Sequence, residues 1–434
     1  MLPQSTFMVL APIRAAAHDE LEALLAQMND RPGQADPENP LLPFARFDRL
    51  HVARFVILES NTADDLRLYG IEPQPWQPAL AFLGDCDGSG RAFLAQLVEV
   101  AAPGLLRIFA CCEDPPADER ALLDWLQARN QAPQANYVNW IGRTVTQVRE
   151  EAALHRTLAA RLAVLQAAGE ADDPRALRQK LLSHIEWEKA EGRLSLSPPP
   201  PTPRDWWLRD RLHLVGVPLL LLAASPLLLA ILPLAAWRLR MLERADPLIA
   251  QRPDPAHLRR LAEREDHLVT NQFNVLGEVK PGPFRGLLLR FLLLLLDYAA
   301  RHVYRRGFLT RVKSIHFARW VLIDGGRRLF FASNYDGSLE SYMDDFINKV
   351  AWGLNLVFSN GVAYPPTRWL IKGGAEHEQL FKYTLRRHQL PSQVWYKANP
   401  DLSAFDMLRN GLIRQGVERR PRDDAALRAW LAMI

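Results

Sequence analysis

The chain has 434 residues, 48% of them hydrophobic and 24% charged, with a formal net charge of +4. This length allows two or three domains with sizeable cores. The three cysteines exclude a disulfide framework and are not spaced with histidines as metal ligands, so no metal site is expected. The charge is small and no aromatic-basic platform accompanies it, which predicts no nucleic-acid partner.

The chain contains a degenerate copy of itself. Residues 82–109 return as 331–358 with 8 identities over 28 positions, and the segment FLGDCDGS becomes FASNYDGS. Upstream, residues 50–57 return as 315–322. A repeat of this size indicates that the fold contains two similar units, and a fold assigned without it would be wrong.

In the first copy, hydrophobic spacing predicts the order strand, helix, two strands, helix, strand. The strands are expected at 7–14, 50–58, 79–83 and 105–111, and the helices at 17–28 and 90–100. A tail follows, with a helix at 118–131, an extended stretch through Tyr137 and a helix at 145–165.

The segment between the copies resembles neither of them. A charged stretch at 170–193 leads into a proline-rich linker, which is stiff in such sequences. Residues 212–237 then contain no acidic or basic side chain and are long enough to span a bilayer. Trp207 and Trp237 flank this apolar segment, as is common at membrane interfaces.

Prolines divide the apolar segment into pieces too short to span a bilayer. We therefore predict a helical hairpin that bends near Ser225 and Pro226, enters the membrane and returns on the same side. Arginines on both flanks agree with a cytoplasmic position for both ends. The alternatives are a single span, which would separate the two copies, and a soluble buried hairpin.

The second copy repeats the pattern of the first. Its strands are expected at 271–280, 315–323, 328–333 and 354–359, and its helices at 287–304 and 339–350. Its tail has a helix at 376–389, an extended stretch through Tyr396 and a helix at 403–415.

Each copy thus has the βαββαβ order of a ferredoxin-like unit, whose sheet carries helices on one face only. The uncovered faces of two copies could cover each other. This order and the duplication resemble the dimeric α/β-barrel superfamily, which includes dye-decolorising peroxidases and chlorite-dismutase-like haem proteins. The resemblance implies an α+β fold with two ferredoxin-like repeats packed sheet to sheet, and the apolar helical hairpin is inserted in the chain between them. It also implies haem as a possible cofactor and a peroxidase-like oxidoreductase if the protein is an enzyme.

Two aspartates are candidate site residues through this resemblance. Residues 84–88 fit the GxxDG pattern in which the aspartate, here Asp87, lies over the haem of dye-decolorising peroxidases. The second copy has Asp336 at the same place but lacks the first glycine. The alternative is structural, because an aspartate before Gly-Ser at the start of a helix is a typical capping or turn residue.

The duplicated His-x-x-Arg strand supplies the other candidates. His51 and His316 could bind a cofactor, and Arg54 and Arg319 could clamp an anion. Because side chains alternate along a strand, each histidine is expected to point away from its arginine. A buried arginine is costly unless it is paired. The structural alternative is therefore a salt bridge inside each repeat, to Asp87 or Asp336.

We therefore predict three parts: 1–168, 169–270 with the apolar segment 212–237, and 271–434. No signal peptide is recognisable, which indicates an intracellular protein. The expected function is a membrane-associated protein on the cytoplasmic side of a bacterial inner membrane. It would contact membrane lipid and bind or act on a lipophilic small molecule. The alternative is a non-enzymatic membrane scaffold or lipid-binding module.

Overall fold

The computed structural model describes residues 1–304, 307, 309, 312–419 and 422–434. This part of the chain combines helices with two four-stranded antiparallel sheets, which confirms the predicted α+β class. Short two-stranded ribbons accompany the sheets, namely β2 (Asn29–Arg31) with β3 (Gln34–Ala35) and β10 (Thr367–Arg368) with β11 (Lys372–Gly373).

The first sheet has the strand order β1-β5-β4-β12. Its strands are β1 (Gln4–Pro12), β4 (Leu50–Leu58), β5 (Ala79–Asp87) and β12 (Val394–Lys397). Apolar side chains of this sheet share a core with three helices, α1 (His18–Ala26), α3 (Gly90–Phe109) and α4 (Glu119–Ala128). The helices of the first copy therefore form where their hydrophobic spacing predicts them.

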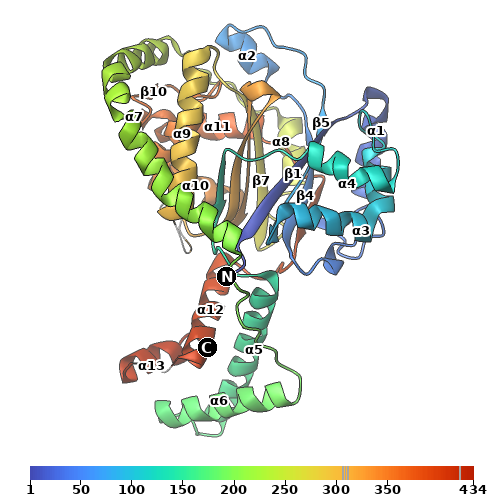
Figure 1. The fold of residues 1–434 in the computed structure, drawn as a ribbon, viewed down its shortest axis with the longest axis vertical. Helices are drawn as coiled ribbons and strands as arrows, with labels where there is room; N and C mark the ends of the chain where they lie inside the picture. Colours follow the sequence, from blue (N-terminus) through green and yellow to red (C-terminus); the bar gives the residue numbers. More distant parts are fainter. Residues whose placement is uncertain (305–306, 308, 310–311, 420–421) are drawn as a thin grey trace.

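The second sheet has the order β6-β8-β9-β7. Its strands are β6 (Ala135–Val138), β7 (Thr270–Glu278), β8 (Ile315–Ile323) and β9 (Arg328–Asp336). Its core includes side chains of α9 (Pro283–His302) and α10 (Leu339–Phe358), and α11 (Glu378–His388) packs at its margin. Figure 1 shows α9 and α10 on one side of the sheets and α3 and α4 on the other.

Each sheet takes its fourth strand from the tail of the other copy. Tyr396 of β12 pairs with Ala53 of β4, and Tyr137 of β6 pairs with Ala318 of β8. The two extended tail stretches predicted from sequence are therefore strands, and they interlock the halves of the chain.

The fourth strands predicted inside each copy, at 105–111 and 354–359, are wrong. α3 continues to Phe109, and α10 continues to Phe358. A short apolar run suits a buried strand and a buried helix equally well. The exchanged strands already occupy the sheet edges that local strands would have filled.

A third buried cluster draws side chains from both sheets. Val56 of the first sheet and Val321 of the second belong to it. Their neighbours Phe55 and Trp320 belong instead to the cores that contain the helices, as the alternation of side chains along a strand requires. The two sheets thus contribute to one shared core.

The apolar segment lies in a single 42-residue helix, α7 (Arg204–Ala245), with no turn at Ser225 and Pro226. The predicted helical hairpin is therefore wrong in its local structure. Figure 1 shows that α7 nevertheless changes direction, as a long limb and a shorter limb that meet at an angle. Sharp changes of helix direction are typical of proline, and α7 contains three.

The remaining helices lie around this body. Those near its margin are α2 (Ala63–Tyr69) and α8 (Pro255–Ala262). A projecting cluster is formed by α5 (Val145–Ala167), α6 (Pro174–Ala190), α12 (Ala404–Glu418) and α13 (Asp424–Leu431). The cluster has its own core of leucines with Trp430 and extends away from the sheets (Figure 1).

Candidate functional site

The structure brings the duplicated histidine and aspartate of each copy together. His51 Nε2 lies 2.8 Å from Asp87 Oδ1, and His316 Nε2 lies 2.6 Å from Asp336 Oδ1. Because Nε2 faces the carboxylate in each pair, Nδ1 is the ring nitrogen left to meet a ligand. The sequence identified these four residues but did not predict that they pair.

The second carboxylate oxygen of each aspartate binds the start of a tail helix. Val145 N of α5 donates to Asp87 Oδ2 at 2.9 Å, and Ala404 N of α12 donates to Asp336 Oδ2 at 2.7 Å. Helix N-termini favour such negative charge. Burial alone would raise the pKa of Asp336, but His316 and hydrogen bonds to the carboxylate hold that pKa below its ordinary value.

The aspartates do not cap the helices that follow them directly. The N-cap residues of α3 and α10 are Ser89 and Ser338, whose hydroxyls accept from Ala92 N and Ser341 N. The predicted capping role thus falls on the serine two residues further along. Each aspartate instead ties its strand to a helix of the tail.

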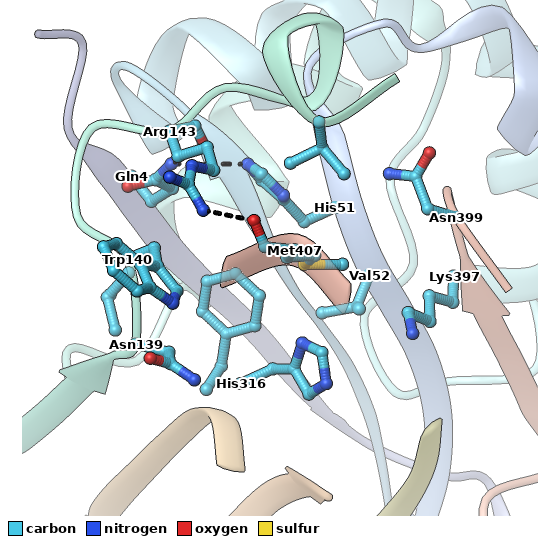
Figure 2. A pocket seen from close by; sticks show the side chains of 13 residues that line it. Gln4, His51, Val52, Asn139, Trp140, Arg143, His316, Lys397, Asn399 and Met407 are labelled. Atoms are coloured by element: carbon cyan, nitrogen blue, oxygen red, sulfur yellow. Dashed lines mark hydrogen bonds between the residues drawn. The ribbon is translucent and has the colours of Figure 1, made fainter. Parts of the chain in front are cut away.

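Both histidines line one pocket between the two copies. Figure 2 shows His51 and His316 facing it from above and below, with Trp140 and Arg143 on one side and Lys397 on the other. The hollow encloses about 460 Å³, counted with the space open to solvent. The β-bulges beside His51 and His316 interrupt strict alternation, so adjacent side chains of one strand can face this pocket.

Lys397 is the most unusual charge in this pocket. Its Nζ donates to Thr270 Oγ1 and to Leu402 O, and the residue is buried. Burial lowers the pKa of Lys397 to about 8, although Asp336 and two further carboxylates oppose the shift. Arg143, at the opposite side, donates to Met407 O at 2.7 Å and lies 3.4 Å from Glu151.

The duplicated arginines lie in the core between the sheets. Both are only 2% exposed. Arg319 forms an ion pair with Asp85 of β5 and donates to Phe7 O at 2.9 Å. The predicted burial and carboxylate pairing of Arg319 are therefore confirmed. The partner lies in the other repeat, however, so the predicted salt bridge inside each repeat is wrong.

Arg54 has the same position in the first copy but a different partner. It hydrogen-bonds to Asn334, to Asn274 Oδ1 at 2.9 Å and to Ser333 O at 3.1 Å. Asn334 occupies the position that Asp85 has in the first copy, so Arg54 contacts no carboxylate directly. Burial first, and then the charge of Arg319, lower the pKa of Arg54 to about 9.

These residues do not fit a haem. Asp87 of the GxxDG segment is buried and held by His51 and by α5, so it does not lie over a large cavity. The histidine pocket is narrowed by Phe317, whose ring centroid lies 5.5 Å from that of His51. The arginines are engaged within the protein core. The contacts of all six candidates thus support the fold.

Comparison with protein-family models, with curated proteins and with solved structures found no match to this chain.

The most unusual surface is that of α7. By length and composition, two helices in the described part of the chain could cross a membrane, α3 and α7. Half of the apolar window of α3 is buried, but only 6% of that of α7. The alternative of a soluble buried hairpin is thus wrong, because leucines along α7 face outward, including Leu212, Leu220, Leu222, Leu227, Leu229 and Leu234.

Each end of α7 is attached to the body of the protein. Near its start, Tyr298 Oη of α9 donates to Leu214 O at 3.2 Å. Near its end, Glu243 accepts from Leu370 N at 2.8 Å, and Asp246 forms a salt bridge of 2.6 Å with Lys280. Between Pro218 and Arg238 no residue is buried.

Hydroxyl groups satisfy two carbonyls that the prolines of α7 leave without a helical donor. Proline lacks an N–H, so the carbonyl four residues earlier loses its partner. Tyr298 donates to Leu214 O, four residues before Pro218, and Ser225 Oγ donates at 2.7 Å to Leu222 O, four residues before Pro226. The sequence therefore keeps α7 helical through prolines that we expected to break it.

Proposed function

We propose that the chain is a monotopic protein of the cytoplasmic membrane face that binds a lipophilic small molecule. One observation carries the proposal. α7 has an apolar middle that the protein leaves uncovered, between two ends that the protein holds. Exposed apolar patches of this extent are typical of membrane or partner contacts.

The attachment of both ends favours entry and return on the same side. A spanning helix would carry its ends to opposite faces of the bilayer, which is incompatible with both contacts to a single body. Exposed Trp207 and Trp237 near the ends of the apolar run suit the interface. Arginines beside them, including Arg209 and Arg238, suit anionic lipid head groups.

We also propose that the two halves are ferredoxin-like repeats whose sheets face each other, as in the dimeric α/β-barrel superfamily. The matching strand orders, the exchanged fourth strands and the core shared by both sheets support this arrangement. The contacts of Arg54 and Arg319 with the opposite sheet support it as well.

Binding is proposed here in preference to oxidoreductase chemistry. The histidine–aspartate pairs and the two arginines are occupied by contacts that hold strands and helices together. This observation favours the lipid-binding module over a peroxidase-like enzyme. Membrane lipid remains the proposed partner of α7.

A vesicle-flotation assay tests the membrane contact. Leu220, Leu227 and Leu234 of α7 are each more than 60% exposed, and all three are changed to glutamine. Because burying one leucine contributes about 1.5–3 kcal/mol, we expect at least about a tenfold loss of partitioning onto phosphatidylethanolamine–phosphatidylglycerol vesicles.

The matched control changes three exposed apolar residues away from α7 to glutamine, namely Leu68, Val164 and Leu412. This variant should float as the native chain does. Equal flotation of the α7 variant and the native chain would refute the proposal.

A further inference from the structure

The pocket that contains the two histidines is lined by positive charge. Among the described residues of its wall, none is acidic and four are basic, namely His51, Arg143, His316 and Lys397. The space available to water inside it measures about 40 Å³. One water molecule needs roughly 10–15 Å³ by the same measure, so the pocket has room for a few waters or for one small ion.

Lys397 is a buried ammonium group without a counter-ion. The residue is 7% exposed, and its Nζ donates to two neutral oxygens, Thr270 Oγ1 and Leu402 O. Lys280 is a buried lysine too, but it forms a salt bridge of 2.6 Å with Asp246, whereas Lys397 forms none with the residues that the structure describes. A buried charge is costly unless it is paired, so Lys397 points to a partner that the chain does not supply.

The first copy shows that the fold does not need this lysine. Tyr137 of β6 and Tyr396 of β12 have equivalent places in the two sheets, so the residues that follow them, Val138 and Lys397, are equivalent as well. Val138 packs into an apolar cluster with Phe317. The strand therefore forms with an apolar side chain in one copy, and the charge of Lys397 is an addition to the other.

Each histidine presents one unused ring nitrogen. Nε2 of His51 and Nε2 of His316 meet aspartates, whereas neither Nδ1 has a hydrogen-bond partner in the described part of the chain and neither is sealed from solvent. Thr270 Oγ1 accepts from Lys397 Nζ and lies 3.2 Å from His316 Nε2, so the lysine and this ring meet at one hydroxyl. An imidazolium that donates from Nε2 to a carboxylate still has an N–H at Nδ1 for an anion.

An anion suits this pocket better than a metal ion does. Histidines held by carboxylates are common metal ligands. Within the described ranges, however, no group of three or more His, Cys, Asp and Glu side chains is placed to hold a metal ion. The charges of Lys397 and Arg143 would repel a cation and attract an anion.

We infer that this pocket binds one small oxyanion, of about the size of formate, between the two copies. Its oxygens accept from Lys397 Nζ at one side and from Nδ1–H of His51 and His316 above and below, the sides from which Figure 2 shows these residues facing the pocket. Arg143 adds to the positive potential, although Glu151 at 3.4 Å offsets part of its charge. The anion supplies the counter-charge that Lys397 lacks, and this role does not depend on a membrane contact of α7.

The melting temperature of the full chain in detergent micelles tests the site. Sodium formate replaces sodium gluconate at constant ionic strength and at pH 7, where Lys397 is protonated because its pKa is about 8. Both anions are monocarboxylates, but the long hydroxylated chain of gluconate does not fit the enclosed space. A ligand that binds only the folded state stabilises it, so the melting temperature should rise with formate and then level off. Equal melting temperatures in the two salts at every concentration would overturn the inference on the native chain alone.

Two lysine variants separate the site from a general salt effect. Lys397→Met should raise the apparent dissociation constant for formate, taken from the same titration, at least tenfold. The matched control is Lys280→Met, which removes the buried lysine that has Asp246 as its partner and should leave this constant unchanged. If Lys397→Met and the native chain depend equally on formate, the stabilisation is a general salt effect and the site is refuted.

Discussion

The two copies of the repeat differ most where their long helices meet the rest of the chain. Both helices have the same kink, at Ala101 in α3 and at Val350 in α10. Beyond the kink, α3 lies under the connection that includes Leu41, whereas α10 borders a groove. The comparison teaches that two copies of one core can keep the same kinked helix and still pack it differently.

The copies also differ in the groups that contact their equivalent buried arginines. Arg319 meets the carboxylate of Asp85, whereas Arg54 meets the amide of Asn334 and backbone carbonyls. Of the two buried guanidinium groups, that of Arg319 contacts a carboxylate and that of Arg54 contacts neutral acceptors. The sequence repeat conceals this asymmetry, because the arginines are identical and only their partners differ.

The largest loss of stability is expected when the ion pair between Arg319 and Asp85 is broken. Arg319→Leu leaves Asp85 buried without its partner, which should lower the free energy of unfolding by about 3–5 kcal/mol. Arg54→Leu leaves only neutral acceptors and should cost about 1–3 kcal/mol. Urea denaturation of both variants measures the difference.

A double variant sharpens this test. Changing Arg319 and Asp85 together to leucine removes both charges, so most of the stability lost in Arg319→Leu should return. If Arg319→Leu costs no more than Arg54→Leu, the asymmetry between the copies has no energetic consequence.

The next largest change in stability is expected at the two equivalent glycines, Gly104 of α3 and Gly353 of α10. Gly104→Ala places a β-carbon against Leu41 O and should cost about 3 kcal/mol. Gly353→Ala brings a β-carbon into ordinary contact with Val350 Cγ1 at 3.5 Å and should raise stability by up to about 1 kcal/mol, because alanine is the better helix former. Thermal unfolding of the two single variants compares them. Equal losses at both positions would show that α10 is covered in solution as α3 is.

Lys397 should make stability depend on pH. Its pKa is about 8 in the folded protein and about 10.4 in an unfolded chain. Between these values the unfolded chain binds more protons, so stability should rise with pH. The Lys397→Met variant should have a higher free energy of unfolding than the native chain at about pH 7. This difference should shrink by up to roughly 3 kcal/mol by about pH 11.

Unfolding titrations across this pH range measure the change. The comparison with Lys397→Met isolates this lysine from Lys280, whose pKa burial also lowers to about 8. A stability difference that stays constant with pH would show that Lys397 titrates normally.

The smallest loss of stability is expected at the helix N-caps, and it should be equal in the two copies. Ser89→Ala and Ser338→Ala each remove the N-cap of a long helix and should each cost about 1 kcal/mol. Denaturant titration measures both losses. A loss in one copy without a loss in the other would mean that the helix starts are not equivalent.

Much of the fold could be predicted from the repeat. β4 and β8 have the predicted bounds, and the tail helices lie where their spacing placed them. The strand exchange could not be predicted, because alternation gives the faces of Tyr137 and Tyr396 but not the sheet that each joins. The continuation of α3 and α10 was missed for the reason that short apolar runs carry no periodicity.

The candidate site could be predicted only in part. The repeat singled out His51 and Asp87 with their counterparts, but their pairing depends on how two strands align. Lys397 and Arg143 gave no signal, since each is one charge among many in the sequence.

Cysteine labelling on the two sides of α7 tests the central claim most directly. Arg204→Cys and Leu248→Cys place single reactive thiols at exposed positions before and after the helix, while the native cysteines are buried. We predict that a membrane-impermeant maleimide labels neither position in intact bacterial cells and both after the membrane is opened. Labelling of one position but not the other in intact cells would contradict the account, because the two ends of α7 would then lie on opposite sides of the membrane.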